Sequence, residues 1–234
     1  MNTRASGRSS GAGRDQLIAH IREVMGNRQR TLLGIAGPPG AGKSTLAGAL
    51  AKDFDVDARI VGMDGFHLSQ VRLADLGRLD RKGAIDTFDG PGFLNLIRRL
   101  RNGSSDTVYA PEFRREIEES VGGVVDIGPD VRLVIVEGNY LLVPQGPWGG
   151  LRELFDEVWY CEPSESTRIT GLVARHRVYG RTEDEARRWA LGPDQRNAEL
   201  VATTRATADL VVTLDFNASD LKDSIICTEK NSKW

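Results

Sequence analysis

The feature that most constrains this chain is a phosphate-loop motif, G-x-x-x-x-G-K-[ST], which GPPGAGKS fills at every fixed position of residues 37–44. Residues 31–36 (TLLGIA) before it predict a buried strand, and residues 44–54 after it carry a helical apolar repeat. The loop is therefore expected to present main-chain amides to an anion at a helix N-terminus, where the helix dipole also favours negative charge. The motif predicts a triphosphate ligand.

Each residue type in the motif has an expected role. The ammonium of Lys43 should reach the β- and γ-phosphates, and the hydroxyl of Ser44 should bind Mg²⁺. Pro38 and Pro39 lack an N–H and stiffen the turn, which leaves the following amides to converge on the anion. The predicted nucleotide-binding residues of the loop are Gly37, Gly40, Ala41, Gly42, Lys43, Ser44 and Thr45.

A dinucleotide-binding fingerprint is the weaker interpretation of the same residues. Gly40 and Gly42 open a helix, and Asp64 follows at about the distance of one βαβ unit. Thr45 argues against this interpretation, because it stands where the fingerprint needs a third glycine for close packing of helix and strand. A lysine–serine pair also has no part beside a pyrophosphate in that fold.

Composition limits the partners. The chain has 234 residues, enough for one α/β domain, and 31 basic against 33 acidic residues give a net charge of −2. No global basic field indicates nucleic acid, so we expect a small ligand. The two cysteines show neither metal-ligand spacing nor a disulfide framework, and no apolar window reaches the length of a membrane span. We therefore expect a cytoplasmic protein without membrane partners and keep a homodimer as an open alternative.

Short apolar runs alternate with helical patterns along the chain, which indicates a mainly parallel sheet with helices on both faces. The expected fold is α/β, a P-loop NTPase-type three-layer sandwich with a mainly parallel five-stranded sheet and a helical lid. Strands are predicted at residues 31–36, 58–63, 131–136, 157–161 and 210–214, with a further strand or hairpin arm at 107–113. Helices are predicted at 15–27, 44–54, 91–101, 163–178, 183–191 and 195–205, and 71–89 is expected to be a binding loop.

Two carboxylates directly follow predicted strands. Asp64 comes after the run at 58–63, and Glu137 comes after the nearly continuous aliphatic run at 131–136. Because ligands of doubly wound sheets bind at the carboxyl ends of the strands, both side chains should face the phosphate loop. There Glu137 suits Mg²⁺, and Asp64 suits a base for an acceptor hydroxyl. The alternative for Asp64 is an N-cap or turn aspartate.

An arginine stripe marks the helix predicted before residue 178. Arg168, Gly171 and Arg175 share one side of it, and Arg181 follows where the helix should end. The glycine leaves room for a bulky anion between the two arginines, although arginines two turns apart are usually just solvated. A cationic lid that gathers charge around a transferring phosphoryl group is the functional interpretation.

These residues together suit kinase chemistry, with Asp64 as a base for an acceptor hydroxyl, Lys43 on a metal-bound nucleotide and the arginine stripe as a cationic lid. The chain has no guanine-reading N-K-x-D segment after a later strand, and a motor ATPase would normally be larger. We expect transfer of the γ-phosphate of MgATP to a hydroxyl of a small metabolite. The alternative is a nucleotide-binding regulatory ATPase without such an acceptor, and Asp64 separates the two because a pure sensor needs no base there.

Four segments resemble the uridine kinase, pantothenate kinase and phosphoribulokinase group of phosphate-loop kinases. Residues 64–66 (DGF) and 82–89 (KGAIDTFD) resemble segments of bacterial pantothenate kinases, with Ile85 in place of a proline. Residues 110–113 (APEF) followed by Arg115 resemble the acceptor-site segment of uridine kinases, and residues 167–181 resemble their lid helix. With EGNYLL after the third strand, the combination looks most like the nucleoside/nucleotide kinase-like, or fructose-transport-associated, subgroup.

The resemblance implies the remaining assignments. The kinase domain would span residues 15–216, with the lid at about 163–192, between a disordered tail at 1–14 and a C-terminal tail at 217–234. It leaves the acceptor open among a nucleoside, a pantothenate-like compound and a sugar. The catalytic residues would be Asp64 as the base, Lys43, and Arg175, which would meet the phosphates. Ser44 and Glu137 would bind the metal, and Arg168 and Arg181 would make further nucleotide contacts. The implied substrate-binding residues are Phe66, His67, Lys82, Asp86, Phe113, Arg115, Asn139 and Tyr140.

Overall fold

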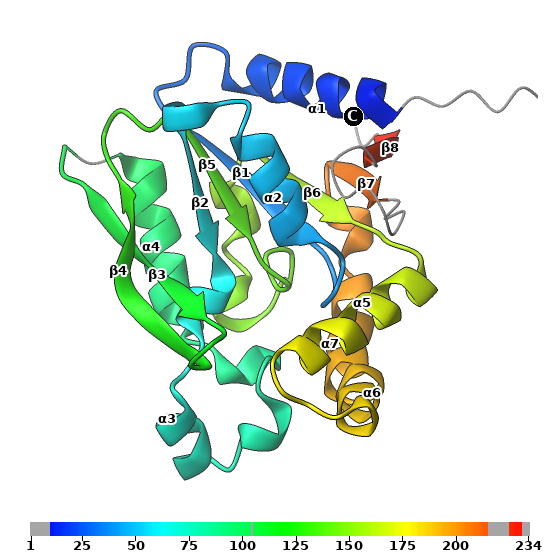
Figure 1. Ribbon diagram of the computed structural model, residues 1–234. Coiled ribbons are helices and arrows are strands. Elements are labelled where there is room, and N and C mark those ends of the chain that lie inside the picture. Colours follow the sequence, from blue (N-terminus) through cyan, green and yellow to red (C-terminus); the bar gives the residue numbers. More distant parts are fainter. Residues whose placement is uncertain (1–9, 104, 215–224, 231–234) are drawn as a thin grey trace, which may run out of the picture.

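The computed structural model describes residues 10–103, 105–214 and 225–230 (Figure 1). Its centre is a six-stranded sheet in the order β2-β5-β1-β6-β7-β8, in which β8 pairs antiparallel with β7 and the other strands are parallel. The predicted mainly parallel five-stranded sheet is confirmed, and β8 adds an edge strand that the sequence pattern did not indicate. The strands are β1 (Thr31–Ala36), β2 (Ala58–Gly62), β5 (Leu133–Glu137), β6 (Glu157–Cys161), β7 (Leu210–Leu214) and β8 (Ile225–Lys230).

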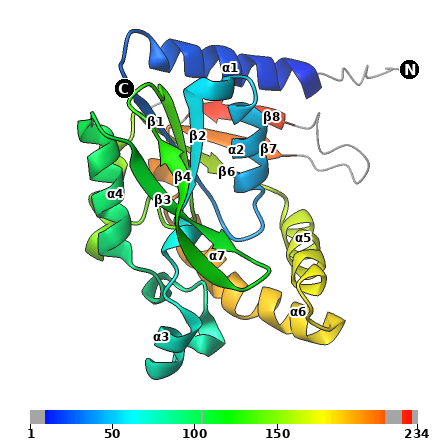
Figure 2. The ribbon, with the colours of Figure 1, turned by 60° about the vertical axis from the view of Figure 1, so that its left-hand side comes forward.

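Helices cover both faces of this sheet and make a three-layer sandwich (Figures 1 and 2). Strand β5 shows the cause, because its side chains alternate between two separate apolar clusters, Leu133 and Ile135 in one and Val134 and Val136 in the other. A strand buried on both faces reads as a continuous aliphatic run. The first cluster packs under α1 (Ser10–Met25) and α2 (Lys43–Ala51), and the second under α4 (Gly90–Asn102) and α7 (Pro193–Ala202).

Helix α1 begins five residues before the predicted start of a helix at residue 15. Leu17, Ile18, Ile21 and Met25 recur at helical spacing and are buried in the first cluster. Fully burying an aliphatic side chain of this size contributes about 1.5–3 kcal/mol, which anchors the helix along the sheet. Residues 1–9 of the expected N-terminal tail, and 215–224 and 231–234 around the expected C-terminal tail, lie outside the described residues.

A two-stranded antiparallel ribbon, β3 (Val108–Arg114) and β4 (Glu119–Ile127), runs beside β2 and in front of α4 (Figure 2). The sequence predicted the first arm but not β4. The Gly122–Gly123 pair interrupts the alternation of that strand, and its central residues are exposed, so no periodic signal marks it. The tip of the ribbon, residues 115–118, reaches the same end of the sheet as the lid.

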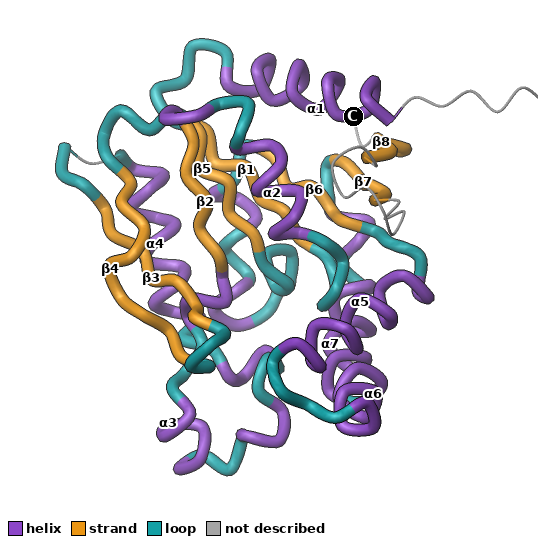
Figure 3. The backbone as a smooth tube through the Cα atoms, viewed as in Figure 1, coloured by secondary structure: helices purple, strands orange, loops and turns teal. Residues whose placement is uncertain are grey.

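The segment predicted as the lid contains α5 (Glu165–Val178) and α6 (Glu183–Leu191), which lie with the start of α7 beyond the carboxyl ends of the strands (Figure 1). A small, separate apolar cluster lies between α5 and α6 and consists of Leu172, Val173, Ala186 and Ala190. Short helix α3 (Gln70–Asp75) lies at the same end of the molecule, across from the lid (Figure 3). Throughout the described ranges, no helix combines the length and apolar character needed to cross a membrane.

Candidate active site

The phosphate loop connects the carboxyl end of β1 to the first turn of α2. Gly40 and Gly42 have φ angles of 79° and 83°, a region that glycine adopts without steric cost. A Cβ atom on Gly40 would also come within 2.7 Å of Cγ of Leu172 in α5. Glycine is therefore required at Gly40 both for the tight turn and for the direct packing of the lid helix on the loop.

The polar side chains of the loop meet the residues that follow β5. Lys43 is buried, and its Nζ donates to the carbonyl of Pro38 at 3.0 Å and to Oδ1 of Asn139 at 2.7 Å. The hydroxyl of Ser44 donates to Oε1 of Glu137 at 3.0 Å. The amide of Ala41 donates to the carbonyl of Pro38 at 3.1 Å, so this predicted phosphate-binding amide is engaged inside the loop.

A cavity of about 660 Å³ lies between the loop and α5, within the range typical of small-molecule sites. The loop supplies main chain at the N-terminus of α2, while the helix supplies hydroxyls and a glycine. Arg115 and Arg175 complete the wall. The lining residues are Gly40, Ala41, Gly42, Lys43, Ser44, Thr45, Arg115, Ser166, Thr167, Thr170, Gly171 and Arg175. We call this space the loop cavity.

A second cavity of about 300 Å³ continues from Lys43 towards α3, the ribbon tip and the end of the lid. We call it the distal cavity. It shares Gly40, Lys43, Ser44, Arg115 and Arg175 with the loop cavity, so the two spaces meet at the phosphate loop. Its other lining residues are Pro39, Asp64, His67, Gln70, Leu79, Lys82, Gly83, Phe88, Phe113, Glu118, Glu137, Asn139, His176, Tyr179, Arg181, Trp189, Asp194 and Asn197.

Asp64 lines the distal cavity, in a 3₁₀ turn, Met63–Phe66, that directly follows β2. Its Oδ2 accepts from a guanidinium nitrogen of Arg115 at 3.0 Å. The contacts that hold the turn are made by the main-chain carbonyl of Asp64. This carbonyl accepts from the amide of His67 at 3.1 Å and lies 2.8 Å from Nδ1 of the same residue. The carboxylate is thus directed into the cavity, which favours the functional interpretation over a turn aspartate.

The two carboxyl groups at the strand ends differ in acidity. Burial favours the neutral form of Asp64, but His67 in its cationic form, Arg115 and Lys43 outweigh burial and lower the pKa of Asp64 below its usual value. Burial, followed by the negative charge of Asp64, raises the pKa of Glu137. Arg115 is always charged and touches Asp64 directly, so Asp64 is the more acidic member of the pair.

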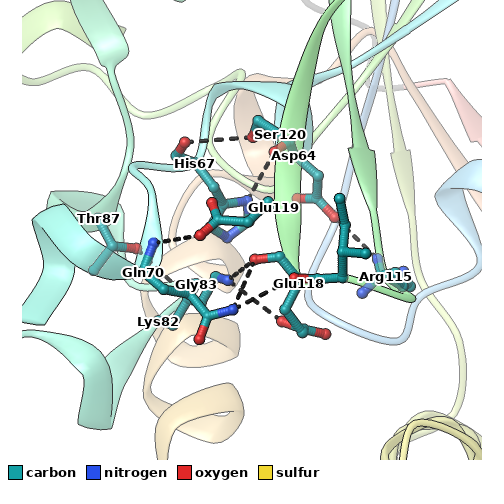
Figure 4. A network of polar contacts seen from close by, with 11 residues as sticks. Asp64, His67, Gln70, Lys82, Gly83, Thr87, Arg115, Glu118, Glu119 and Ser120 are labelled. Carbon is teal, nitrogen blue, oxygen red and sulfur yellow. Dashed lines mark hydrogen bonds and ion pairs between the residues drawn. The ribbon is translucent and has the colours of Figure 1, made fainter.

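A network of polar contacts holds the far wall of the distal cavity (Figure 4). Nζ of Lys82 donates to the carbonyl of Glu118 at the ribbon tip at 2.5 Å. Oε1 of Glu119 accepts from the first amide of α3, that of Gln70, at 2.9 Å. The hydroxyl of Ser120 donates to the carbonyl of His67 at 3.4 Å. The ribbon, α3 and the segment after β2 are thereby joined into one wall.

Comparison with known proteins places the chain among kinases. No protein-family model matches it. A Schizosaccharomyces pombe protein named as a candidate uridine kinase is 34% identical over 212 residues, which cover 85% of this chain and 89% of that protein. A candidate fructose transport system kinase from Silicibacter sp. TM1040 has a crystal structure with a TM-score of 0.75 and 36% identity, covering 88% of this chain and 99% of that one. The chain belongs to the uridine kinase, pantothenate kinase and phosphoribulokinase group of phosphate-loop kinases.

A third relative shows how broad this kinase group is. A pantothenate kinase of Paenarthrobacter aurescens is 29% identical over 241 residues, which cover 87% of this chain and 74% of that protein. The relatives confirm the predicted fold and family and give no support to the dinucleotide interpretation. Because their names refer to different acceptors, membership of the group leaves the acceptor of this phosphate-loop kinase open.

Two residues implied as acceptor contacts lie away from both cavities. The ring of Phe66 packs against that of Phe93, 5.1 Å between centroids, at the edge of the second apolar cluster. Asp86 forms ion pairs with Arg81 at 2.9 Å and Arg78 at 3.3 Å, and the hydrogen bond from Arg81 lowers its pKa. The 3₁₀ turn Ile85–Thr87 directs this carboxylate towards the arginines. Neither Phe66 nor Asp86 lines either cavity, so their expected contact with an acceptor stays a prediction.

Tyr140 and Arg168 also lie outside the lining of both cavities. Tyr140 is fully buried, its pKa is raised by burial, and its hydroxyl donates to the carbonyl of Gly83 at 2.7 Å. Arg168 is buried, pairs with Glu165 at 2.8 Å and donates to the carbonyl of Pro39 at 3.4 Å. It therefore fastens α5 to the phosphate loop instead of lining the loop cavity. Gly37, likewise, does not line either cavity and lies against the carbonyl of Cys161.

The other two lid arginines that were predicted as site residues, Arg175 and Arg181, face different spaces. Arg175 lines both cavities, and burial followed by the nearby charge of Arg115 lowers its pKa. Arg181 lines only the distal cavity, where its guanidinium lies 3.9 Å from the ring centroid of Trp189. Arg181 is predicted to contact the nucleotide, but in the structure it lies beside the distal cavity and not beside the loop cavity.

Sequence reasoning missed several residues of the distal wall. His176, read as an ordinary helix-face residue, pairs with Asp194 of α7 at 2.8 Å. Asn197 donates to the carbonyl of Gly83 at 3.1 Å, the same acceptor that Tyr140 uses. No local pattern identifies these residues, because each contact joins segments that lie far apart in the chain. The small residues Ser166, Thr167 and Thr170 had a weak signal, since they share the lid helix with Gly171.

Proposed function

We propose that this phosphate-loop kinase is a Mg²⁺-dependent ATP:alcohol phosphotransferase that acts on a hydroxyl of a small metabolite. The loop cavity would take the nucleotide, and the distal cavity would take the acceptor. Their meeting point at Lys43, Ser44, Arg115 and Arg175 is where a γ-phosphate would lie. A nucleoside, a pantothenate-like compound and a sugar are the acceptor classes that the family resemblance brings forward.

Ser44 in the first turn of α2 and Glu137 at the end of β5 fit a magnesium ion. The Ser44 hydroxyl and a Glu137 oxygen lie 3.0 Å apart beside the loop. Mg²⁺ is usually held by one or two protein oxygens together with substrate phosphates and water, and a closed cage of protein ligands is unnecessary.

Each of the side chains at the site would have its own role in phosphoryl transfer. Bound MgATP would supply the phosphoryl group and the charge that neutralises the β- and γ-oxygens. Lys43 would bind those oxygens, and Asp64, kept ionised by its lowered pKa, would orient the acceptor hydroxyl and take its proton. The acceptor oxygen would bond to the γ-phosphorus as the bond to the bridging oxygen breaks and ADP leaves. Arg175 would stabilise the charge on the transferring group.

The single observation that carries this proposal is the position of Asp64, with its carboxylate in the cavity that also contains Lys43, Ser44 and Arg175. The test is acceptor-dependent release of ADP across a panel of hydroxylated metabolites. Asp64→Asn should retain the fold and the affinity for ATP and should lose about 10²–10⁴-fold in kcat. ATP binding without any acceptor-dependent ADP release would contradict the kinase proposal and favour a nucleotide-binding regulator. Loss of folding in Asp64→Asn would favour a structural role for the aspartate.

A further inference from the structure

The distal cavity contains more cationic side chains than its own carboxylates neutralise. Three of its carboxylates are already committed to partners. Asp64 pairs with Arg115 at 3.0 Å, and Asp194 pairs with His176 at 2.8 Å. Glu118 pairs with Lys82, 3.4 Å between Oε2 and Nζ. The fourth, Glu137, accepts from the hydroxyl of Ser44 beside the phosphate loop.

Arg181 stands apart from these pairs. Within the described part of the chain, its side chain makes no ion pair or hydrogen bond, and its contact is the face of Trp189, 3.9 Å from the ring centroid. Glu185 is influenced by its charge, but the carboxylate of Glu185 accepts the amide and the hydroxyl of Thr182 in the capping box of α6. The guanidinium of Arg181 is therefore held without a carboxylate of its own.

Stacking determines which part of this guanidinium remains available. The Cζ atom lies over the ring at 3.9 Å, and no side-chain N–H group of Arg181 donates to a described residue, so these donors are available to form two parallel hydrogen bonds with a carboxylate or a phosphate. Trp189 also fixes the orientation, which reduces the entropy lost on binding. Both residues line the distal cavity and neither lines the loop cavity, so the group is placed for the acceptor and not for the nucleotide.

We propose that the acceptor carries an anionic group, a carboxylate or a phosphate, in addition to its reacting hydroxyl, and that Arg181 binds this group in the distal cavity. The inference rests on the proposed function and narrows its acceptor class. Arg175, which lines both cavities, remains beside the transferring phosphoryl group. A neutral nucleoside or sugar would leave Arg181 unpaired in the distal cavity, and this unpaired charge selects against such acceptors.

The test compares matched pairs of acceptors that differ in the anionic group: D-glycerate with glycerol, pantothenate with pantothenol, and ribose 5-phosphate with ribose. The first two pairs probe a carboxylate and the third probes a phosphate. Binding is measured by calorimetry with a non-hydrolysable ATP analogue present, and turnover is measured as ADP release. We expect at least one anionic compound to bind about 10–100-fold more tightly than its neutral partner, as typical for a hydrogen-bonded charge.

The variants assign that preference to Arg181. Arg181→Gln should remove the preference and leave the affinity for the ATP analogue unchanged, and Arg181→Lys should restore only part of it, because lysine lacks the planar fork. Arg188→Gln is the matched control, since Arg188 is exposed on the helix that carries Trp189 and lies outside both cavities. It should behave as wild type.

The outcomes separate this inference from the proposed function. Equal binding of neutral and anionic partners, failure of every anionic compound to bind, or an unchanged preference in Arg181→Gln overturns the inference. If neutral and anionic partners bind equally, or if Arg181→Gln keeps the preference, continued ADP release would leave the kinase proposal intact. Anion binding that depends on Arg181 without any ADP release would support the anionic site and contradict the kinase proposal.

Discussion

The phosphate-loop wall of the loop cavity and the wall of the distal cavity differ in how they are assembled. The first, which we call the contiguous wall, is the single segment 40–45 after β1, while α5 and Arg115 line the rest of the loop cavity. The second takes side chains from the segment after β2, the ribbon tip, the lid and α7, which are joined by contacts such as Lys82 with Glu118 and His176 with Asp194.

The difference follows from what each wall has to recognise. A triphosphate presents the same oxygens in every nucleotide, so main-chain amides, a helix dipole and one ammonium group suffice, and these occur together in a short motif. An acceptor is recognised by its shape and by individual polar groups, which require side chains directed inward from several elements. The same loop can therefore serve many kinases, while the distal wall changes with the substrate.

The largest effect is expected on the contiguous wall. Lys43→Ala should weaken ATP binding and lower kcat by about 10³–10⁵-fold, the range for removing a cation that contacts the transferring group. Kinetics at saturating ATP and calorimetry with an ATP analogue measure the two effects. Lys52→Ala, an exposed lysine just after the same helix, should match wild type. Unchanged activity of Lys43→Ala at saturating ATP would show that the loop does not hold the reacting phosphates.

A smaller effect is expected at the junction of the two walls. Arg175→Ala should lower kcat by about 10²–10³-fold, or about 3–4 kcal/mol of barrier, because the guanidinium acts on charge that develops during transfer. Its dissociation constant for ADP should change far less. Arg175→Lys should recover only part of the rate, since lysine lacks the planar fork.

Arg98→Ala is the control for the lid arginine. Arg98 is exposed on α4, outside both cavities, and its removal should leave the kinetics near those of wild type. If Arg175→Ala and Arg98→Ala behave alike, the lid arginines are only surface residues and the two walls do not meet in a working site.

The smallest effect concerns pH. Arg115 lowers the pKa of Asp64, so Arg115→Gln should raise this pKa. A carboxylate works as a base only above its pKa, so the acidic limb of kcat/KM should move to higher pH, by about one unit for the loss of an opposite charge. Arg114→Gln, which removes an exposed arginine paired with Glu112, should leave the limb in place. An unmoved limb in Arg115→Gln would mean that Asp64 is not the group that titrates.

The sequence by itself determined the fold class and the contiguous wall. The aliphatic run at β5, the apolar spacing of α1 and the phosphate loop are local patterns that hold whatever the rest of the chain does. It also identified Asp64 and Glu137 as a pair at the carboxyl end of the sheet, because the ends of neighbouring parallel strands lie close together. The sequence pattern did not predict strands β4 and β8. Two adjacent glycines interrupt the alternation in β4, and β8 is an edge strand.

Only the tertiary structure decided which polar residues enter the site. Arg168 and Arg181 belong to one resemblance in the sequence, yet Arg168 is buried against the phosphate loop and Arg181 is stacked on Trp189 beside the distal cavity. Asp86 pairs with two arginines of its own loop, and Tyr140 holds the carbonyl of Gly83. The direction of a side chain depends on partners that lie far along the chain. No local spacing encodes those partners, because they become neighbours only when the sheet, the ribbon and the lid have packed together.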